Sequence, residues 1–360
     1  GRRCALHFLL RRDPRHDGDT AHRQGRRGKN HPVDPLRGLP RRIARGCRPS
    51  LRRTGKPAGL RQHPHQGSIP LCRRSSGAAV YADFDEMLEK EELDVLYILL
   101  PPYAQAGQFE KAADKKIHIF IEKPIAITSD RGKSMVDAAR KNGIKTQVGF
   151  HMRYGTAVSK LKRLIEDGSA GKPVLFNGRY QCNSLHAPWW RDVNLCGGQI
   201  FEQAIHVYDI CRYMYGHPKA VASFMGNVCH ADVPGYTVED VSVSISSFTT
   251  GAQASITANN CSVPGRWDAL FDMIFEKVSV FFKSPDEAEF HYITGEGERV
   301  EYFNEPADHK FLEDEDFIRM VKENRTEFCP VEEGLRSLLY VEASLFSAKM
   351  DGEKMRVENY

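Results

Sequence analysis

The stretch Ile117-His118-Ile119-Phe120-Ile121-Glu122-Lys123-Pro124 decides the fold of this 360-residue chain. Its first five residues form a short, almost continuous apolar run, which is typical of a strand that is covered on both faces of a sheet. Glu122, Lys123 and Pro124 end the run. The stretch therefore predicts a buried parallel strand that carries an acid, a lysine and a proline at its carboxyl end.

Two similar apolar runs lie on either side of this strand, at 95–100 and 144–148, and Pro101 and Pro102 stop the first of them. Segments with helical periodicity separate the runs. The expected helices span 84–93, 105–115 and 129–142, the last with Thr128 or Ser129 as N-cap and Gly143 as C-terminal glycine. Strands that alternate with helices indicate β-α-β units. Residues 79–150 are therefore expected to form an α/β unit with a parallel sheet.

The sequence changes character after Gly149, where β-branched and aromatic segments follow one another and the helix at 199–215 is expected to interrupt them. The expected strands span 174–180, 241–248, 252–257, 269–275, 278–282, 289–293 and 300–303. Further helices are expected at 157–166, 311–322 and 331–349. Strands joined by short turns indicate an antiparallel sheet. Residues 151–360 are therefore expected to form an α+β domain with a large, mainly antiparallel sheet.

The composition is that of an ordinary globular protein, with 41% hydrophobic and 27% charged residues. The longest clean apolar run, 95–100, is far too short to span a membrane. The opening residues resemble a signal peptide only in part, because the apolar run is very short and no small-residue cleavage site follows it. Nine cysteines are scattered without a C-x-x-C pair, which favours reduced thiols in a cytoplasmic protein.

One cysteine has a neighbour that suits metal binding. Cys229 stands beside His230, and the two residues resemble half of a metal site. No second pair lies at zinc-finger spacing, so no bound metal is expected.

The charge is distributed very unevenly along the chain. Residues 1–78 contain 18 Arg and 2 Lys against 4 Asp and no Glu, which gives +16, whereas the remaining residues carry −12. This segment is interpreted as a basic disordered extension, as a translation in the wrong frame, or as the product of a mis-joined gene. Nucleic-acid binding through it is a weak alternative, because Phe8 is its one aromatic residue for base stacking before Tyr81.

Two of the predicted strands end in rigid or polar motifs at the edge where open parallel sheets bind ligands. One motif is Pro101, Pro102 and Tyr103, and the other is Glu122-Lys123-Pro124. Packing does not account for a lysine at the tip of a buried strand. The alternative is a lysine whose charged end reaches solvent or an ion-pair partner.

A second candidate site lies at 197–206, where Gly197 and Gly198 open a helix that carries Glu202 and His206. The spacing of i and i+4 places the carboxylate and the imidazole on one face of the helix. Such a pair suits proton transfer near neutral pH, because histidine titrates there and a carboxylate orients its ring. A surface ion pair or a core histidine is the alternative, and a metal site lacks a third ligand.

Taken together, these motifs resemble the Gfo/Idh/MocA oxidoreductase family, named for glucose-fructose oxidoreductase and inositol dehydrogenase. The resemblance runs from about Ala79 to the C-terminus. It is carried by Pro101-Pro102, Ile121-Glu122-Lys123-Pro124-Ile125-Ala126-Ile127-Thr128, Gln147-Val148-Gly149-Phe150, Arg153-Tyr154, Trp190-Arg191, Gly197-Gly198 through His206, and Asp209.

The resemblance implies catalytic roles for Lys123 and His206, with Glu202 in place of the aspartate that is usual four residues before the histidine. It implies hydride transfer between a carbinol carbon of a sugar, inositol or related polyol and the nicotinamide of NAD or NADP. In that reaction His206 removes the hydroxyl proton and Lys123 stabilises the developing alkoxide. It also implies a cis bond between Lys123 and Pro124.

Further contacts follow from the same resemblance. The cofactor-binding residues are expected to be Pro101, Pro102, Tyr103, Gln105, Glu122 and Lys123. Gln105 stands where a histidine is common. The substrate-binding residues are expected to be Arg153, Trp190 and Arg191, with Trp189 as an alternative to Trp190 and structural ion pairs as the alternative for both arginines. The resemblance also implies that residues 79–150 are the C-terminal part of a Rossmann dinucleotide-binding domain. Residues 151–360 are then the α+β domain for substrate binding and oligomerisation, and the open face of its sheet is expected to support a homo-oligomer.

A glycine-rich turn that binds the pyrophosphate of a dinucleotide is expected near the start of such a protein, and residues 1–78 do not contain one. Gly295 and Gly297 come nearest to the G-x-G-x-x-G pattern of such a turn, but they lie in a predicted hairpin. We therefore expect the chain not to bind NAD(P)H in the ordinary way and one edge of the parallel sheet to be uncovered. Three hypotheses stay open: a working enzyme with an unconventional N-terminus, an inactive relative, and a binder of nucleic acid or acidic partners.

Overall fold

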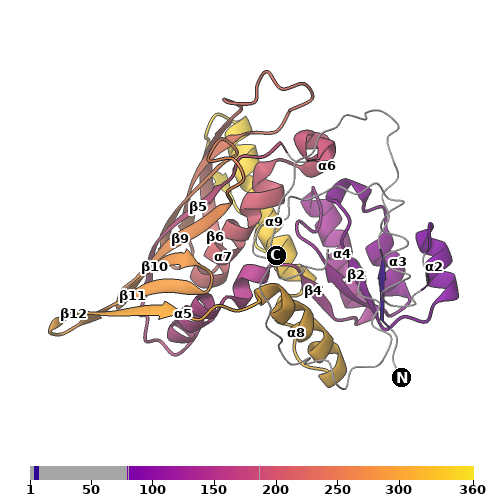
Figure 1. The fold of residues 1–360 in the computed structure, drawn as a ribbon, viewed down its shortest axis with the longest axis horizontal. Coiled ribbons are helices and arrows are strands. Elements are labelled where there is room, and N and C mark those ends of the chain that lie inside the picture. Colours follow the sequence, from indigo (N-terminus) through magenta and orange to yellow (C-terminus); the bar gives the residue numbers. More distant parts are fainter. Residues whose placement is uncertain (1–3, 8–78, 80, 186) are drawn as a thin grey trace, which may run out of the picture.

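The computed structural model describes residues 4–7, 79, 81–185 and 187–360, which form two sheets with helices packed around them (Figure 1). The first sheet has four parallel strands in the order β1-β2-β3-β4. Its strands are β1 Cys4–His7, β2 Val95–Ile98, β3 His118–Ile121 and β4 Thr146–Val148. Its helices are α2 Phe84–Lys90, α3 Gln108–Asp114 and α4 Ser129–Asn142. The expected α/β domain with a parallel sheet is confirmed.

Both faces of the parallel sheet are buried, as its apolar strands predicted. Leu96, Ile98 and Ile119 lie in a core with residues of α3 and α4. Tyr97 and Phe120 point to the other face, where their rings stack at 4.8 Å and contact the helix α8 His309–Glu323 through Phe317. The parallel sheet is therefore completed by a helix from the C-terminal part of the chain.

The strand β1 corrects one expectation about the N-terminal segment. Cys4–His7 pairs in parallel with β2, with Cys4 opposite Val95 and His7 opposite Ile98. The expectation that this edge of the sheet is uncovered is therefore wrong. The remaining expectations for residues 1–78, namely disorder, few contacts and no pyrophosphate-binding turn, lie outside the described residues.

The second sheet has nine strands in the order β12-β11-β10-β9-β5-β8-β7-β6-β13. All neighbours are antiparallel except β5 and β8. The strands are β5 Pro173–Gln181, β6 Pro218–Gly226, β7 Val241–Phe248, β8 Gln253–Asn259, β9 Asp268–Phe275, β10 Val278–Ser284, β11 Glu287–Thr294, β12 Gly297–Asn304 and β13 Met355–Arg356. The mainly antiparallel sheet is confirmed, and β6 and β13 are additions to the prediction. β6 was missed because it begins with proline and contains small residues in place of a β-branched run.

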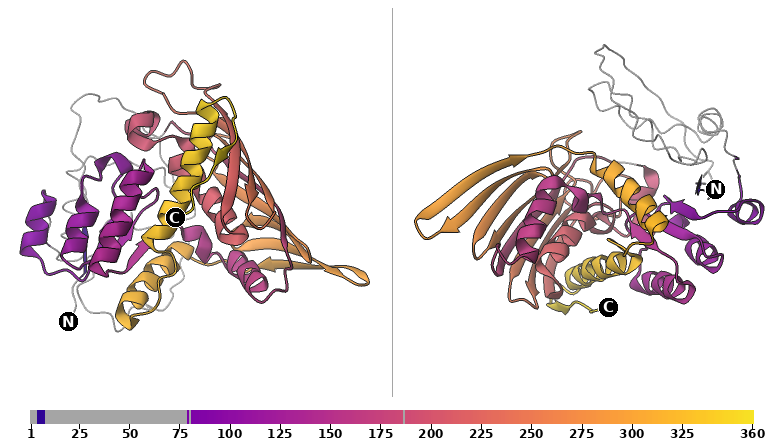
Figure 2. Two further views of the ribbon diagram at one scale, coloured as in Figure 1. Left: turned by 180° about the vertical axis from the view of Figure 1, so that it is seen from behind. Right: turned by 90° about the horizontal axis from the view of Figure 1, so that it is seen from below.

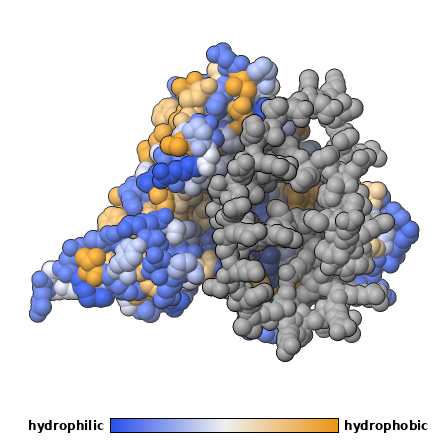
Figure 3. All heavy atoms as spheres, viewed as in Figure 1, coloured by the Kyte–Doolittle hydropathy of each residue, from blue (hydrophilic) through white to orange (hydrophobic). Residues whose placement is uncertain are grey.

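Helices cover one face of this sheet and leave the other face open (Figure 2). The helices that accompany it are α5 Thr156–Glu166, α6 Val193–Cys196, α7 Ile205–Tyr215 and α9 Val331–Lys349. Short helical turns lie at Pro102–Ala104, His151–Tyr154, Pro188–Arg191 and Ile200–Ala204. On the open face, Phe224, Val243 and Ile245 of β6 and β7 are 62%, 46% and 60% exposed. Apolar side chains also gather over the upper part of the sheet in Figure 3.

The helices of the described residues include none that is long and apolar enough to cross a membrane.

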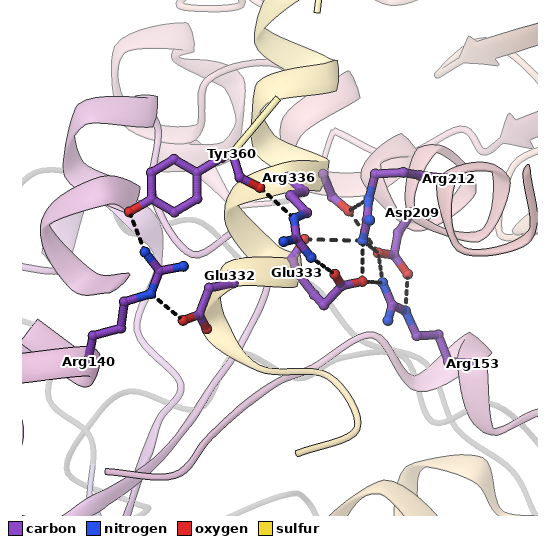
Figure 4. A network of polar contacts seen from close by, with 9 residues as sticks. Arg140, Arg153, Asp209, Arg212, Glu332, Glu333, Arg336 and Tyr360 are labelled. Carbon is purple, nitrogen blue, oxygen red and sulfur yellow. Dashed lines mark hydrogen bonds and ion pairs between the residues drawn. The ribbon is translucent and has the colours of Figure 1, made fainter. Parts of the chain in front are cut away.

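A buried ionic cluster joins three segments of the chain (Figure 4). The guanidinium of Arg153 makes a bidentate pair with Asp209 of α7, at 2.8 and 2.7 Å, and its Nη2 lies 3.0 Å from a carboxylate oxygen of Glu333 of α9. Arg212 binds the same oxygen of Glu333 at 2.6 Å. The side chains of Arg153 and Asp209 are both only 1% exposed. This burial contradicts the expectation that Arg153 contacts substrate and supports the structural alternative.

The cluster yields a prediction about stability. Arg153→Met removes one partner of a buried pair and leaves Asp209 without its bidentate donor, which is expected to lower the free energy of unfolding by about 3–5 kcal/mol. Arg140→Met is the matched control, because Arg140 pairs with Glu332 on the surface and is 54% exposed. That change is expected to cost about 0–1 kcal/mol. Urea denaturation followed by tryptophan fluorescence measures both, and equal shifts of the two midpoints would contradict the prediction.

Candidate active site

The candidate site lies where the carboxyl ends of β2, β3 and β4 face the helix that begins after Gly198. β3 leads directly into Glu122 and Lys123, and the bond between Lys123 and Pro124 is cis, as the resemblance implied. β4 leads into Gly149, whose backbone packs against Glu122, since a Cβ there would lie 2.7 Å from Glu122 Oε2. The absence of a side chain at Gly149 therefore leaves room for the carboxylate of Glu122 beside the end of β4.

Lys123 and Glu202 meet across the two domains. The ammonium of Lys123 donates a short hydrogen bond to the carbonyl oxygen of Glu202, and it lies 3.4 Å from the carboxylate oxygen Oε1. The other carboxylate oxygen accepts a hydrogen bond of 3.0 Å from the indole nitrogen of Trp190. Both charged side chains are mostly buried, at 13% and 20% exposed. The lysine at the strand tip is thus held at the helix that carries His206.

The glycine pair and Glu239 shape the start of this helix. Ile200–Ala204 winds as a π-helix before α7 begins at Ile205, a local widening that is common at functional sites. Glu239 accepts a hydrogen bond of 2.8 Å from the backbone nitrogen of Ile200. Gly198 has φ +123°, and a Cβ there would lie 2.6 Å from Glu239 Oε2. Burial raises the pKa of Glu239 to about 7, although backbone hydrogen bonds oppose the rise.

His206 is buried near four other basic groups. Its ring is 7% exposed and lies 4.8 Å, centroid to centroid, from the ring of His151. His151 in turn shares a hydrogen bond of 3.0 Å with His309, between their two Nδ1 atoms. Burial lowers the pKa of His206 well below its ordinary value, and the charge of Lys123 lowers it further, followed by His151, Lys310 and His309. The neutral form of the His206 imidazole is therefore favoured at pH 7.

Of the buried polar atoms that have no protein partner among the described residues, two belong to predicted site residues. One is Nδ1 of His206 and the other is Oε1 of Gln105, whose amide nitrogen donates to the carbonyl oxygen of Leu100 at 3.4 Å. Buried polar groups normally have a partner. A polar ligand at the carboxyl ends of β2 and β3 would supply these partners, so the residues present fit a nicotinamide cofactor and a hydroxylated substrate.

The other predicted site residues surround this edge. Pro102 is buried, and Tyr103 is 40% exposed with its ring 5.9 Å from Trp189. Trp190 is only 3% exposed, which contradicts the expectation that it offers a free apolar face to a sugar ring. Its indole instead holds Glu202. Arg191 donates to the carbonyl oxygen of Leu185 at 2.7 Å, and a substrate contact of Arg191 stays a prediction.

The sequence interpretation missed three residues of the site, which are His151, His309 and Glu239. His151 follows the end of β4 by three residues. Its position after a strand end could therefore have marked it as a candidate site residue. His309 and Glu239 come from distant segments. Their approach to His206 and Ile200 depends on α8 and on the loop before β7, and no local pattern indicates it.

Comparisons with known proteins agree with this geometry. The model of the oxidoreductase family with an NAD-binding Rossmann fold matches residues 60–150, and the model of the GFO/IDH/MocA C-terminal domain matches residues 158–280. The chain belongs to the Gfo/Idh/MocA oxidoreductase family. The match begins at residue 60, upstream of Ala79, where the motifs that carry the resemblance begin.

Several relatives are named for the substrates on which they act. The chain is 28% identical over 220 residues to scyllo-inositol 2-dehydrogenase (NAD(+)) of Bacillus subtilis (strain 168), which covers 61% of the chain and 64% of the relative. It is 24% identical over 265 residues to myo-inositol 2-dehydrogenase of Thermotoga maritima, covering 72% and 78%. An uncharacterized oxidoreductase, YrbE of Bacillus subtilis (strain 168), matches at 28% identity with 54% of its length covered. The chain thus spans less than two thirds of the length of the two Bacillus subtilis relatives and 78% of the length of the myo-inositol 2-dehydrogenase.

Solved structures share the fold. Levoglucosan dehydrogenase in complex with NADH and levoglucosan matches with a TM-score of 0.73 and 23% identity, covering 81% of the chain and 87% of that structure. The WlbA dehydrogenase from Bordetella pertussis, in complex with NADH and UDP-GlcNAcA, matches with a TM-score of 0.69 and 20% identity, covering 82% and 89%. At these identities the likeness establishes the fold alone.

The environment of His206 gives a prediction about its titration. Its pKa is expected to lie well below 6.5, because burial and the neighbouring Lys123 both disfavour the imidazolium. Lys123→Met removes the second cause and is expected to raise the pKa, while burial keeps it below 6.5. NMR titration of the histidine ring signals tests this, with His206→Gln to assign the signal. A midpoint at or above 6.5 in the unmodified protein would refute it.

Proposed function

We propose that this chain is an NAD-dependent dehydrogenase that oxidises a secondary alcohol of an inositol, sugar or related polyol. The single observation that carries the proposal is the contact between Lys123 and Glu202, which brings the ammonium of the strand tip to the helix that bears a neutral, buried His206. An ammonium and a neutral imidazole at one edge of a parallel sheet match the two needs of alcohol oxidation, since one group stabilises negative charge on oxygen and the other accepts a proton.

Four residues of the chain have separate roles in the proposed oxidation of the alcohol. His206 accepts the hydroxyl proton, for which its depressed pKa keeps it unprotonated. Lys123 binds the same oxygen and stabilises the negative charge that grows on it. Glu202 keeps the ammonium in place, and Trp190 fixes the carboxylate through the hydrogen bond of its indole nitrogen. The nicotinamide, when bound, supplies the acceptor for the hydride.

Residues at the ends of β2 and β3 are proposed to hold the cofactor. They are Pro101, Pro102, Tyr103, Gln105, Glu122 and Lys123. The unpartnered Oε1 of Gln105 supports this assignment, because it is buried at the strand edge where open α/β sheets bind ligands. NAD is proposed over NADP, because one relative is named an NAD(+) enzyme and two of the similar structures contain NADH.

A polyhydroxylated substrate is proposed from the names of the relatives, which include two inositol dehydrogenases and a levoglucosan dehydrogenase. Trp189 and Arg191 are the proposed substrate contacts that remain after Arg153 and Trp190 are assigned to structural roles. Trp189 offers an aromatic surface that suits the apolar face of a ring. Arg191 offers hydrogen-bond donors to hydroxyl oxygens.

The two catalytic assignments are tested by substitution. Lys123→Met and His206→Gln are each expected to lower kcat for oxidation of scyllo-inositol, myo-inositol or levoglucosan by about 10²–10³-fold or more, because each removes a group that acts mainly in the transition state. Lys111→Met is the control, since Lys111 pairs with Asp85 on the surface, and both partners are about half exposed. Reduction of NAD is followed by absorbance.

The turnover of each variant tests the role of Lys123 and that of His206 separately. Retention of full turnover by Lys123→Met or by His206→Gln removes that residue from the mechanism. Loss of turnover by Lys111→Met would mean that the assay reports folding and not chemistry. Circular dichroism of all three variants checks that the fold is kept.

One sequence observation favours a second candidate, an inactive member of the family. Residues 1–78 contain no glycine-rich turn of the kind that lets backbone nitrogens approach the pyrophosphate of a dinucleotide. Titration of the purified chain with NADH and NADPH at physiological salt distinguishes the two candidates. The dehydrogenase is expected to bind NADH saturably in the micromolar range. Binding that is weak and disappears in moderate salt would establish the inactive relative, because unspecific attraction to arginines is screened.

We also propose that the open face of the nine-stranded sheet pairs with a second copy of the chain. The exposed Phe224, Val243 and Ile245 lie next to one another on β6 and β7. Clustered apolar side chains of this kind mark interaction surfaces.

A further inference from the structure

Three residues that bind metals in other proteins lie together at one end of the nine-stranded sheet. Cys229 follows the end of β6 by three residues, Asp240 immediately precedes β7, and Cys261 follows the end of β8 by two residues. The three strands are neighbours in the order β8-β7-β6. Gly226 pairs with Val241, and Val241 pairs with Asn259. The sheet therefore brings Cys229 and Cys261, which stand 32 positions apart in the sequence, together with Asp240 between them.

The side-chain atoms of these residues are close enough to share one ion. The two sulfurs and a carboxylate oxygen all lie within 4.8 Å of one another, and in the part of the chain that is described no other such group of three is found. Tetrahedral zinc with sulfur ligands at about 2.3 Å needs ligand atoms that are roughly 3.5–4 Å apart. Small rotations of the exposed Cys229 and the half-buried Cys261 are enough to reach that spacing.

Asp240 is held in place by its own hydrogen bonds. Its Oδ1 accepts from the backbone nitrogen of Val228 at 2.8 Å, and its Oδ2 accepts from those of Cys229 and His230 at 2.7 and 2.8 Å. The Cys261 thiol lies beside the same residue and donates to its backbone carbonyl at 3.6 Å. A carboxylate has about four acceptor positions, so three backbone donors leave one position open. The ligand oxygen is thus fixed before any ion arrives.

From this geometry we infer a zinc site formed by Cys229, Cys261 and Asp240, with water as the fourth ligand. Two sulfur ligands select a soft or borderline ion and disfavour magnesium and calcium, which prefer oxygen ligands. Solvent reaches the site through the exposed Cys229. His230 is not among the residues whose ligand atoms lie within 4.8 Å of one another, and its Nε2 is bound to the carbonyl oxygen of Asn260 at 2.9 Å.

The site ties a loop to the candidate active site. Asp240 directly follows Glu239, whose carboxylate binds the backbone nitrogen of Ile200 at the start of the helix that carries Glu202 and His206. A metal on Asp240 fixes the segment that positions this helix. The zinc is therefore a structural ion, and a disulfide between the two cysteines is the competing arrangement, in which the carboxylate would have no part.

The experiment measures metal binding by the full chain. The protein is reduced, freed of metal with a chelator and titrated with Co²⁺ and then Zn²⁺. We expect one Co²⁺ per chain with the near-ultraviolet absorption of thiolate-bound cobalt, and displacement of that signal by Zn²⁺. Residues 1–78 contain three further cysteines and six histidines, so the decisive quantity is the difference between variants.

Cys229→Ser, Cys261→Ser and Asp240→Asn are the test variants, and Cys211→Ala is the control because it removes a buried thiol of α7 outside the site. Each test variant is expected to bind Zn²⁺ at least tenfold more weakly, whereas the control keeps the affinity of the unmodified protein. Cys229 is exposed, so Cys229→Ser tests the site without disturbing the core. Unchanged Zn²⁺ affinity in Cys229→Ser, absence of the thiolate–cobalt absorption, or a Cys229–Cys261 disulfide in the protein as isolated would each overturn the proposal.

Discussion

The bidentate pair between Arg153 and Asp209 is the interaction on which the arrangement of the site depends. Both side chains are almost completely buried, so their charges have lost their hydration and must be satisfied within the protein. Glu333 and Arg212 complete the cluster, and Ser337 donates to Asp209 at 2.7 Å. A buried charge network of this kind has few alternative arrangements. It therefore fixes α7 and α9 against the turn that follows β4.

This cluster sets the positions of the reacting groups through short stretches of backbone. His151 stands two residues before Arg153, and His206 stands three residues before Asp209. The same cluster thus places the two imidazole rings in contact. Lys123, at the end of β3, lies close enough for its charge to lower the pKa of His206 further. The pKa of His206 is lowered by this crowding, because burial and the neighbouring basic groups all disfavour a positive charge on its imidazole. The lowered pKa of His206 beside Lys123 is therefore a consequence of packing.

The two domains are less separate than their sequences suggest. α8 belongs to the C-terminal part of the chain, yet Phe317 and Met320 pack on the parallel sheet against Tyr97 and Phe120. α9 packs closely on the first domain at Gly334, where a Cβ would lie 2.8 Å from Ile125. The nine-stranded sheet supports α7 on its covered face. Its strand ends supply Glu239, which binds the first turn of the helix that carries the site. Motion between the domains would therefore disturb the proposed catalytic groups directly.

The sequence by itself determined the elements whose signals are local. The helices Ser129–Asn142 and Val331–Lys349 were predicted with their exact bounds; for the first, Thr128 accepts a hydrogen bond at its start and Gly143 adopts φ +60° at its end. Lys123, Glu202 and His206 were predicted because a strand end and a helical spacing each carry information within a few residues. The tertiary structure decided what depends on contacts between distant segments. It assigned Arg153 to a buried cluster, turned Trp190 toward Glu202, and brought His309, Glu239 and Cys261 to their partners. Short-range patterns record the backbone preferences of neighbouring residues, whereas the partner of a buried charge or thiol depends on how whole sheets and helices pack.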